Sequence, residues 1–296
     1  MKKSSIYLWI ALLLIILGTL GGCKHNVPTP SPSNSNTNSD SISENIPPQE
    51  NPPQPQPPVE TQPSEPSTPA SSSASWWFTR NANHQTPAVP SQIAALLAAN
   101  NGFYVLPNNE KKIYLTFDCG YELGNTPSIL DTLDRHQIKA AFFMTGQFIQ
   151  TQPELVKRMQ ASGHLVCNHT WNHPDLPTLS QAKFNQEITS LEQRYNQLTG
   201  AQLAHYLRPP NGNYSPDTLK WANELGYRTV FWSIAFQDWD PSNQPGAEYS
   251  YQHIMANIHP GAVILLHVVS KSDTDALDRI ITDLQKQGYV FSTFNG

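Results

Sequence analysis

Short, nearly continuous apolar runs alternate with longer amphipathic segments from Lys112 to the end of the 296-residue chain. Continuous apolar runs of this length are typical of strands that are buried on both faces of a sheet. We expect about seven strands, at residues 113–117, 140–144, 164–167, 206–207, 230–234, 263–266 and 289–293. Helices between such strands favour a parallel sheet, so the alternation predicts an α/β fold.

Helix signals separate these runs. Helices are expected to begin near Pro127, Pro153 and Pro216, because proline favours the first turn of a helix. Ser180 is expected to cap a longer helix whose apolar residues recur at steps of three and four, and Gly200 to end it. A last helix is expected over 276–287, and a helix and loop over 76–109 before the first strand. We predict a distorted (β/α) barrel of about seven strands rather than an open, doubly wound sheet. No glycine-rich dinucleotide motif or P-loop follows the first strand, so nothing supports nucleotide binding.

The first 75 residues depart from this pattern and form two segments. Residues 1–23 combine a basic start, an apolar stretch and Leu20-Gly21-Gly22-Cys23, which is typical of an export signal and resembles the lipobox of bacterial lipoproteins. Cys23 would then carry the lipid; a plain signal peptide or an uncleaved anchor is the alternative. Residues 24–75 are rich in Pro, Ser, Asn and Gln and are expected to be a disordered tether. Residues 76–296 are expected to form the folded domain.

These segments predict an exported protein, lipid-anchored at the outer face of the cell membrane and facing the cell wall. The net charge of −5 comes without a basic cluster, which argues against nucleic-acid binding. With Cys23 lipidated, Cys119 and Cys167 remain, too few for a disulfide framework. A single tethered domain makes a monomer the simplest expectation.

Ionisable side chains follow five of the expected strands. In chain order they are Asp118, His169, Arg208, Asp238 and His267. Because the C-terminal ends of parallel strands meet at one edge of a sheet or one end of a barrel, ligands and chemistry gather there. The sequence therefore predicts one site assembled from distant segments.

His169 and His173 are four residues apart and lead into a proline-rich loop. Imidazole suits Zn and other borderline divalent metals. A His-x3-His pair alone is most simply a coincidence, but its position after a buried strand favours a metal site. Beside such a metal, Asp118 would accept a proton from a bound water; the alternative is a carboxylate that caps the turn.

Arg208 and Asp238 have supporting roles in this interpretation. Arg208 would pair with Asp118 and keep it ionised, the alternative being a surface arginine on a structural loop. Asp238 would orient His267 and raise its pKa, which makes His267 a candidate proton donor; a histidine that only packs in the core is the alternative. Tyr214, Trp171 and Trp239 suit stacking against sugars or plain core filling.

The same segments resemble the ordered motifs of the polysaccharide deacetylases, the NodB-homology domains of carbohydrate esterase family 4. The segments that carry the resemblance are 116–120 (TFDCG), 169–173 (HTWNH), 208–212 (RPPNG), 238–239 (DW) and 265–267 (LLH). The resemblance covers essentially all of 76–296. It is closest to the sporulation group that removes acetyl from N-acetylmuramic acid in peptidoglycan on the way to the δ-lactam of spore cortex.

The resemblance implies a metal-dependent hydrolase of peptidoglycan glycan. His169 and His173 would hold the ion, Zn first, with Co, Mn or Mg as alternatives. Asp118 would be the base and Arg208 would orient it. The metal and a backbone N–H of the 208–211 loop would hold the developing oxyanion, while His267, oriented by Asp238, protonates the leaving amine. Asn211, Tyr214 and Trp239 are expected to contact the substrate.

Two positions depart from the family pattern. Cys119 stands where the family usually has a second aspartate that binds the metal. It could be a thiolate ligand, a spectator beside a two-histidine site, or the partner of Cys167 in a disulfide. Asn211 stands where the muramic group tends to carry arginine, and asparagine cannot supply that charge to a lactyl carboxylate. The alternatives are a deacetylase of peptidoglycan N-acetylglucosamine, an O-acetyl polysaccharide esterase, and a non-catalytic glycan-binding lipoprotein.

Overall fold

The computed structural model describes residues 72–80, 83–107 and 110–295. The chain divides into two units, Met1–Gln62 and Pro63–Gly296, and every described residue belongs to the second. The expected signal segment with Cys23, and the tether up to residue 71, lie outside the described residues. Across the described ranges, no helix combines the length and the apolar character that crossing a membrane requires.

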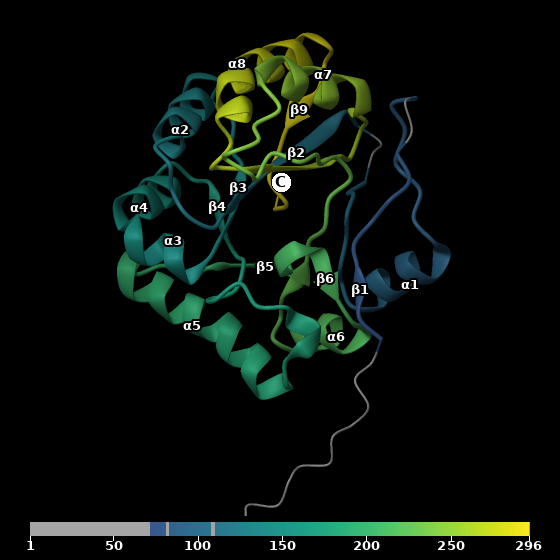
Figure 1. The fold of residues 1–296 in the computed structure, drawn as a ribbon, viewed down its shortest axis with the longest axis vertical. Helices are drawn as coiled ribbons and strands as arrows, with labels where there is room; N and C mark the ends of the chain where they lie inside the picture. The colour runs from purple at the N-terminus through teal and green to yellow at the C-terminus, as the bar shows by residue number, and fades with distance from the viewer. Residues whose placement is uncertain (1–71, 81–82, 108–109, 296) are drawn as a thin grey trace, which may run out of the picture. The chain divides into compact units, whose positions relative to one another are not determined.

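A parallel sheet of seven short strands forms the centre of this unit (Figure 1). Its hydrogen-bonded order is β7-β5-β4-β3-β2-β8, and β9 also pairs with β2. The strands are β2 (Lys112–Cys119), β3 (Ala141–Met144), β4 (Leu165–Asn168), β5 (Ala204–Leu207), β7 (Arg228–Thr229), β8 (Val263–His267) and β9 (Val290–Phe291). The sheet curls into an incomplete barrel, which confirms the predicted α/β fold with a distorted barrel of about seven strands.

One expected strand is wrong. Residues 230–234 do not form a ladder; β7 ends at Thr229, and the following segment makes only single bridges, Phe103 with Val230 and Ile234 with Ile264. Ser233 N–H donates to Val263 O at 3.0 Å. The apolar run is buried because it crosses from the β5–β7 edge of the sheet to β8 and partly closes the barrel there.

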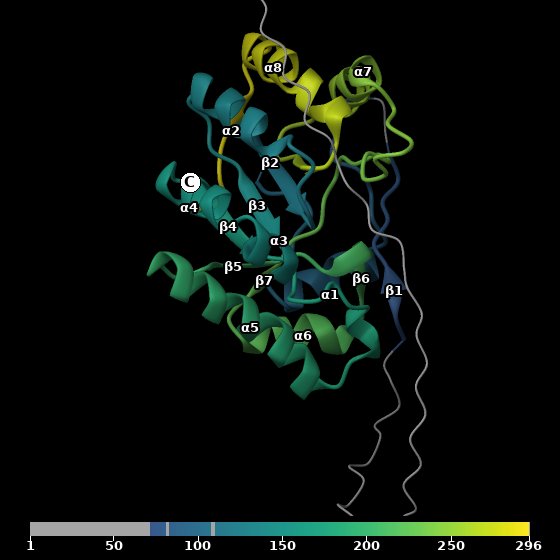
Figure 2. The same cartoon turned by 60° about the vertical axis from the view of Figure 1, so that its left-hand side comes forward.

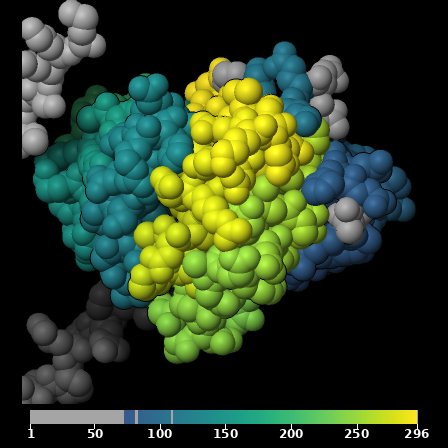
Figure 3. Space-filling view, turned by 90° about the horizontal axis from the view of Figure 1, so that it is seen from above, coloured from purple at the N-terminus to yellow at the C-terminus, as the bar shows by residue number. Residues whose placement is uncertain are grey.

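Helices cover the outer face of the sheet. The main helices are α1 (Ser91–Ala99), α2 (Thr126–Arg135), α3 (Gly146–Thr151), α4 (Pro153–Ala161), α5 (Gln181–Thr199), α6 (Pro216–Glu224), α7 (Ala247–Asn257) and α8 (Lys271–Lys286), with single 3₁₀ turns η1 (Leu176–Thr178) and η2 (Pro210–Gly212). Figure 2 shows α2, α4 and α5 in a row along β2 to β5. Seen from above in Figure 3, the yellow-green and yellow residues of α7 and α8 lie between the teal segments and the blue N-terminal ones.

The helix boundaries follow the local signals in most places. Ser180 caps α5 by accepting the N–H of Lys183, and Gly200 ends it in the left-handed conformation, as expected. The last helix begins at Lys271, earlier than expected, because Ser270 is its cap and its first turn is polar. Neither α3 nor α7 was predicted from the sequence.

Side chains of β2 alternate between the two faces of the sheet, and this alternation decides which residues reach the site. Ile113, Leu115, Phe117 and Cys119 point outward into the main core beneath the helices. Tyr114, Thr116 and Asp118 occupy the alternate positions, and Tyr114 packs in a separate cluster on the inner side. Full burial of side chains such as Leu115 and Phe117 stabilises the fold by about 1.5–3 kcal/mol each.

The folded unit begins before residue 76. Ala74–Ser75 form β1, which pairs antiparallel with β6 (Asn213–Tyr214), so the expected tether boundary at 75 is two residues too late. Trp76 stacks on Phe231 with 4.5 Å between ring centroids. Its indole N–H donates to Trp232 O at 3.0 Å. The start of the described chain is therefore fixed against the loop that follows β5.

Gly146, at the start of α3, packs tightly against the loop that carries His173, and its N–H donates to Trp171 O at 3.0 Å. A Cβ at residue 146 would lie 2.5 Å from the Trp171 ring and 2.6 Å from Trp171 O. We predict that Gly146→Ala lowers the unfolding free energy by about 1–3 kcal/mol, because the backbone must move apart. Gly120→Ala, whose Cβ meets nothing within 4 Å, is the matched control in thermal unfolding. Equal stability of the two variants would contradict the packing described.

Candidate active site

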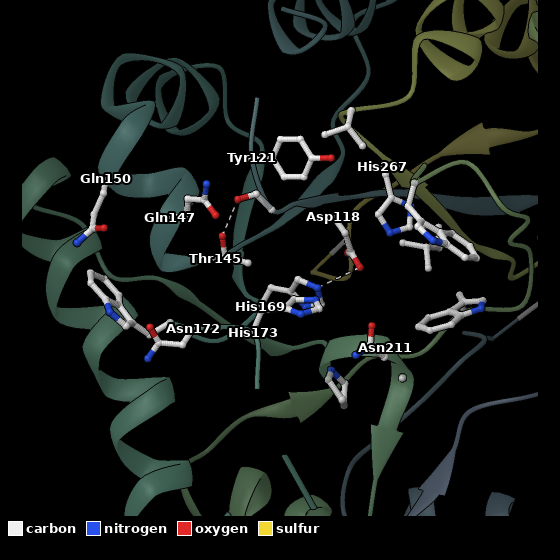
Figure 4. Close-up of a pocket in the computed structure, with 18 residues that line it drawn as sticks. Asp118, Tyr121, Thr145, Gln147, Gln150, His169, Asn172, His173, Asn211 and His267 are labelled. Atoms are coloured by element: carbon white, nitrogen blue, oxygen red, sulfur yellow. Dashed lines mark hydrogen bonds and ion pairs between the residues drawn. The ribbon is translucent and has the colours of Figure 1, made fainter. Parts of the chain in front are cut away.

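A pocket of about 810 Å³ lies at the C-terminal ends of the strands (Figure 4). The predicted residues that line it are Asp118, His169, Trp171, His173, Asn211, Trp239 and His267. In Figure 4, Asp118 lies between His169 on one side and His267 on the other. The strand ends thus bring together side chains that are up to 149 positions apart in the chain.

Asp118 is held by an ion pair that is almost fully buried. Arg208 Nη1 donates to Asp118 Oδ1 at 2.7 Å, and the two side chains are 0% and 7% exposed. Burial alone would raise the pKa of Asp118, but the charges of Arg208 and the nearby histidines outweigh it and hold the pKa below its ordinary value. Asp118 is therefore a carboxylate at neutral pH with one fixed oxygen and one that faces the pocket.

Arg208 is fixed by contacts on every side. Its Nη2 donates to Thr116 Oγ1 at 2.9 Å. The guanidinium also lies 4.1 Å from the centroid of the Phe143 ring and 5.8 Å from that of Trp232, so cation–π attraction adds to the ion pair. The arginine is thus a buried structural cation and not a surface residue.

His169 and His173 face each other with 4.9 Å between ring centroids. His169 Nδ1 lies 2.8 Å from the carbonyl oxygen of Arg208, and since a carbonyl can only accept, Nδ1 carries the hydrogen. Burial lowers the pKa of His169 to about 4, with Asp118 opposing the shift and His173 adding to it. Burial likewise lowers the pKa of His173. Both rings are therefore neutral near pH 7, the form that binds metals.

The geometry around His169 Nε2 suits a cation. Nε2 lies 3.5 Å from Asp118 Oδ2, and with the hydrogen on Nδ1 both atoms are acceptors without a donor between them. A metal ion would satisfy them, and the Arg208 carbonyl orients the ring as metal-binding histidines require. Within the described ranges, no group of three or more His, Cys, Asp or Glu side chains is arranged to enclose a metal. The two neutral imidazoles on the pocket would fit a divalent ion at an open site.

His267 and Asp238 form the second half of the site. Asp238 Oδ1 lies 2.8 Å from His267 Nδ1, and Asp238 Oδ2 accepts the backbone N–H of His267 at 2.7 Å. Burial alone would lower the pKa of His267, but the Asp238 carboxylate outweighs it and the pKa is raised. The ring therefore holds a proton more readily than a free imidazole, with Nε2 left for the pocket.

Comparison with known proteins places the chain in a family. The family model for polysaccharide deacetylases matches residues 106–230. The peptidoglycan-N-acetylmuramic acid deacetylase PdaA of Bacillus subtilis is 45% identical over 237 residues, which cover 80% of this chain and 88% of PdaA. The chain belongs to the polysaccharide deacetylase family.

A solved structure and one further relative support this assignment. The solved structure of Bacillus subtilis PdaA, described as a family 4 carbohydrate esterase, superposes with a TM-score of 0.74 at 46% identity and covers 75% of this chain and 95% of that one. A peptidoglycan-N-acetylglucosamine deacetylase of Bacillus cereus is 36% identical over 63% of this chain and 68% of its own length.

In this polysaccharide deacetylase, Cys119 is not placed to bind a metal. Its side chain is fully buried in the main core on the outer face of β2 and does not line the pocket. Burial, with the charge of Asp118 next, raises the pKa of the Cys119 thiol well above its usual range. The ligand alternative is therefore wrong, because adjacent strand residues point to opposite faces.

Cys119 and Cys167 are both free, so the disulfide alternative is also wrong. The two cysteines belong to different packed clusters, on the outer and inner faces of the sheet. Of the three alternatives for Cys119, the spectator is the one that the fold supports.

Tyr214 is also not a substrate residue in this polysaccharide deacetylase. Its ring is 2% exposed and packs against Phe231 with 5.2 Å between centroids. Trp239, by contrast, is 52% exposed, and its ring lies 5.9 Å from that of His267. Asn211 lines the pocket with a left-handed φ of 55°, a conformation that asparagine tolerates better than most residues.

One wall of the pocket was absent from the sequence-based prediction. Tyr121, Thr145, Gln147, Gln150 and Asn172 line it beside Trp171, and Figure 4 shows the two glutamines and Asn172 on the side away from His267. Gln147 and Gln150 project from α3. Thr145 could have indicated this helix, since it accepts the N–H of Phe148 as a cap residue.

We predict that Cys119→Ala retains the metal content and turnover of the parent protein, because the thiol faces the core. His169→Ala, treated identically, should lose bound metal. The measurement is metal per protein after dialysis, by mass spectrometry of the element. Loss of metal from Cys119→Ala with the fold intact would contradict the assignment.

Proposed function

We propose that this protein removes the N-acetyl group from peptidoglycan, and that N-acetylmuramic acid is its main substrate. One observation carries the proposal: a buried, charge-fixed carboxylate and an aspartate-oriented imidazole share one pocket with a histidine pair. Hydrolysis of an amide needs a base for the attacking water and an acid for the departing nitrogen. Asp118 and His267 meet those two needs.

His169 and His173 are proposed to hold a divalent metal, Zn or alternatively Co, Mn or Mg, which when bound supplies an activated water and polarises the acetyl carbonyl. Two neutral, oriented imidazoles suit such ions. Asp118 Oδ2, which lies 3.5 Å from His169 Nε2, adds negative charge beside the proposed metal position.

Asp118 acts as the base. Arg208 fixes Oδ1, so Oδ2 is the oxygen that faces the reacting water. Because the pKa of Asp118 is lowered, it is ionised at neutral pH and ready to accept a proton. Arg208 keeps this carboxylate in one rotamer throughout the reaction.

His267 acts as the acid. It must be protonated at the start, and a raised pKa increases the protonated fraction near pH 7. Asp238 holds Nδ1–H, so Nε2–H is the proton that passes to the sugar nitrogen as the C–N bond breaks. The acetyl group leaves as acetate and the sugar keeps a free amine.

The loop after β5 offers one backbone donor for the developing oxyanion. Pro209 and Pro210 have no N–H. The N–H groups of Arg208 and Gly212 donate to Asn168 O and Pro209 O. The Asn211 N–H is therefore the loop's candidate oxyanion donor, since donors aimed at developing charge are among the strongest catalytic devices.

The choice of sugar rests on the relatives. The muramic acid deacetylase of Bacillus subtilis is 45% identical over 80% of the chain, whereas the glucosamine deacetylase of Bacillus cereus is 36% identical over 63%. Asn211 favours the alternative, because it gives no positive charge for a lactyl carboxylate. An O-acetyl esterase would use the same residues, and analysis of the product distinguishes it.

The biological setting is proposed from the N-terminal residues and the resemblance. A lipid on Cys23 and the tether that follows it would place the domain outside the cell membrane within reach of the wall. We expect the protein to be a monomer there. Muramic acid that has lost its acetyl group can close to the δ-lactam of spore cortex, so a role in sporulation follows from the preferred substrate.

We predict that Asp118→Asn lowers the rate of acetate release by about 10²–10⁴-fold, because the base is lost. The far-UV circular dichroism spectrum should stay unchanged, since the fold is kept. The measurement is mass spectrometry of muropeptides after purified peptidoglycan, with and without stem peptides, is incubated with the protein and divalent metal. Cys119→Ala is the control, because it changes a core residue next to Asp118 and leaves the base in place.

The same spectra decide the substrate. Acetyl loss on muramic acid supports the proposal, and loss on glucosamine moves the protein to the alternative. Acetyl loss from neither sugar, with metal supplied, would contradict de-N-acetylation.

A further inference from the structure

Asp273 is a buried carboxyl group next to the acid half of the site that the mechanism does not yet use. It is the third residue of α8 and is 1% exposed. Its backbone N–H donates to Ser270 Oγ at 3.1 Å, which caps the helix. The helix start alone therefore explains why a serine stands at 270, but not why a carboxyl group is buried at 273.

The ordinary use of an acidic side chain at this position is to accept the N–H of the cap residue. Here the Ser270 N–H donates instead to His267 O at 2.9 Å. Among the described residues, no N–H or O–H group makes a hydrogen bond of normal geometry to either carboxyl oxygen of Asp273. A buried carboxylate without donors would be costly, so capping does not account for this residue.

The groups around Asp273 indicate which form it takes. The Asp238 carboxylate and the hydroxyls of Ser250, on α7, and Ser270 surround it. Two carboxyl groups in contact away from water do not both ionise readily. Asp238 is held as the anion by the two bonds from His267, so Asp273 is the one that retains the proton. Burial and then the Asp238 charge raise the pKa of Asp273 well above its usual range.

We infer that Asp273 is a positioning residue, protonated in the working enzyme, that donates its O–H to the Asp238 carboxylate and so forms a chain Asp273–Asp238–His267. This inference rests on the proposed function of His267 as the acid. The O–H bond gives the Asp238 carboxylate a further fixed partner besides His267. It also draws off part of the negative charge that holds the His267 proton.

The consequence is a limit on how tightly His267 keeps its proton. Without the Asp273 donor, all of the Asp238 charge would act on the imidazolium, and transfer to the leaving nitrogen would be harder. The other charges that act on His267 are those of Asp118 and Arg208, from β2 and the end of β5, and that of His173 when its ring is protonated. Substitutions at 273 leave all three of these groups in place.

The test is the pKa of the His267 ring, measured by NMR titration in the full protein, with the His267→Gln variant to assign the signal. Asp273→Asn keeps a neutral donor, so the ring pKa should stay within about 0.2 units of the parent. Asp273→Ala removes the donor, so the pKa should rise by about 0.5 units or more. In this variant the alkaline limb of the pH profile of kcat/KM should shift to higher pH together with the ring pKa. The kcat should fall several-fold.

Two results would overturn the inference about Asp273. If Asp273 were ionised, Asp273→Asn would remove a negative charge and the His267 pKa would fall, which overturns the inference even if the alanine variant does not fold. Unchanged titration in both variants, with lowered thermal stability, would leave only a helix-capping role and also overturn it. If the titrations follow the prediction but the parent protein releases no acetate, the positioning role stands and the proposed function fails.

Discussion

The buried ion pair between Arg208 and Asp118 is the interaction on which the rest of the site depends. One guanidinium joins Asp118 and Thr116 on β2 to the loop after β5, and its Nε lies 3.4 Å from Val230 O on the segment that partly closes the barrel. Removing one partner of such a pair typically costs about 3–5 kcal/mol. The same contact that ties three segments together therefore also fixes the base.

The proposed acid, His267, is also held by a buried charged residue, which here is Asp238. Asp238 holds His267 by its ring and its backbone N–H, and Gln244 donates to Asp238 O at 2.7 Å while its own oxygen accepts from Ser270 and Ser272 at the start of α8. The base and the acid are thus each set by a buried charged partner. The histidine pair lies on the far side of Asp118, as Figure 4 shows.

Most of the strands, though not the run at 230–234, and the polar residues that follow them could be predicted from the sequence, because apolar runs and strand-end polar groups are local signals. Asp118, His169, Arg208, Asp238 and His267 all lie together as expected. Cys119 could not be placed, because the apolar run predicts a strand that ends at 117, whereas β2 continues through Cys119 and so points its side chain away from that of Asp118. Tyr214 failed because a tertiary contact with Phe231 buries it. The pocket wall from α3 was missed because a six-residue helix carries too little periodicity to be detected.

The central claim is that Asp118 is the base and that Arg208 acts through it. A double-mutant cycle on acetate release from peptidoglycan, with Asp118→Asn, Arg208→Met and the double variant, tests this most directly. The account predicts that each single variant is strongly impaired and that the double variant is no slower than Asp118→Asn alone. Losses that multiply in the double variant, with the fold intact in all three, would contradict it.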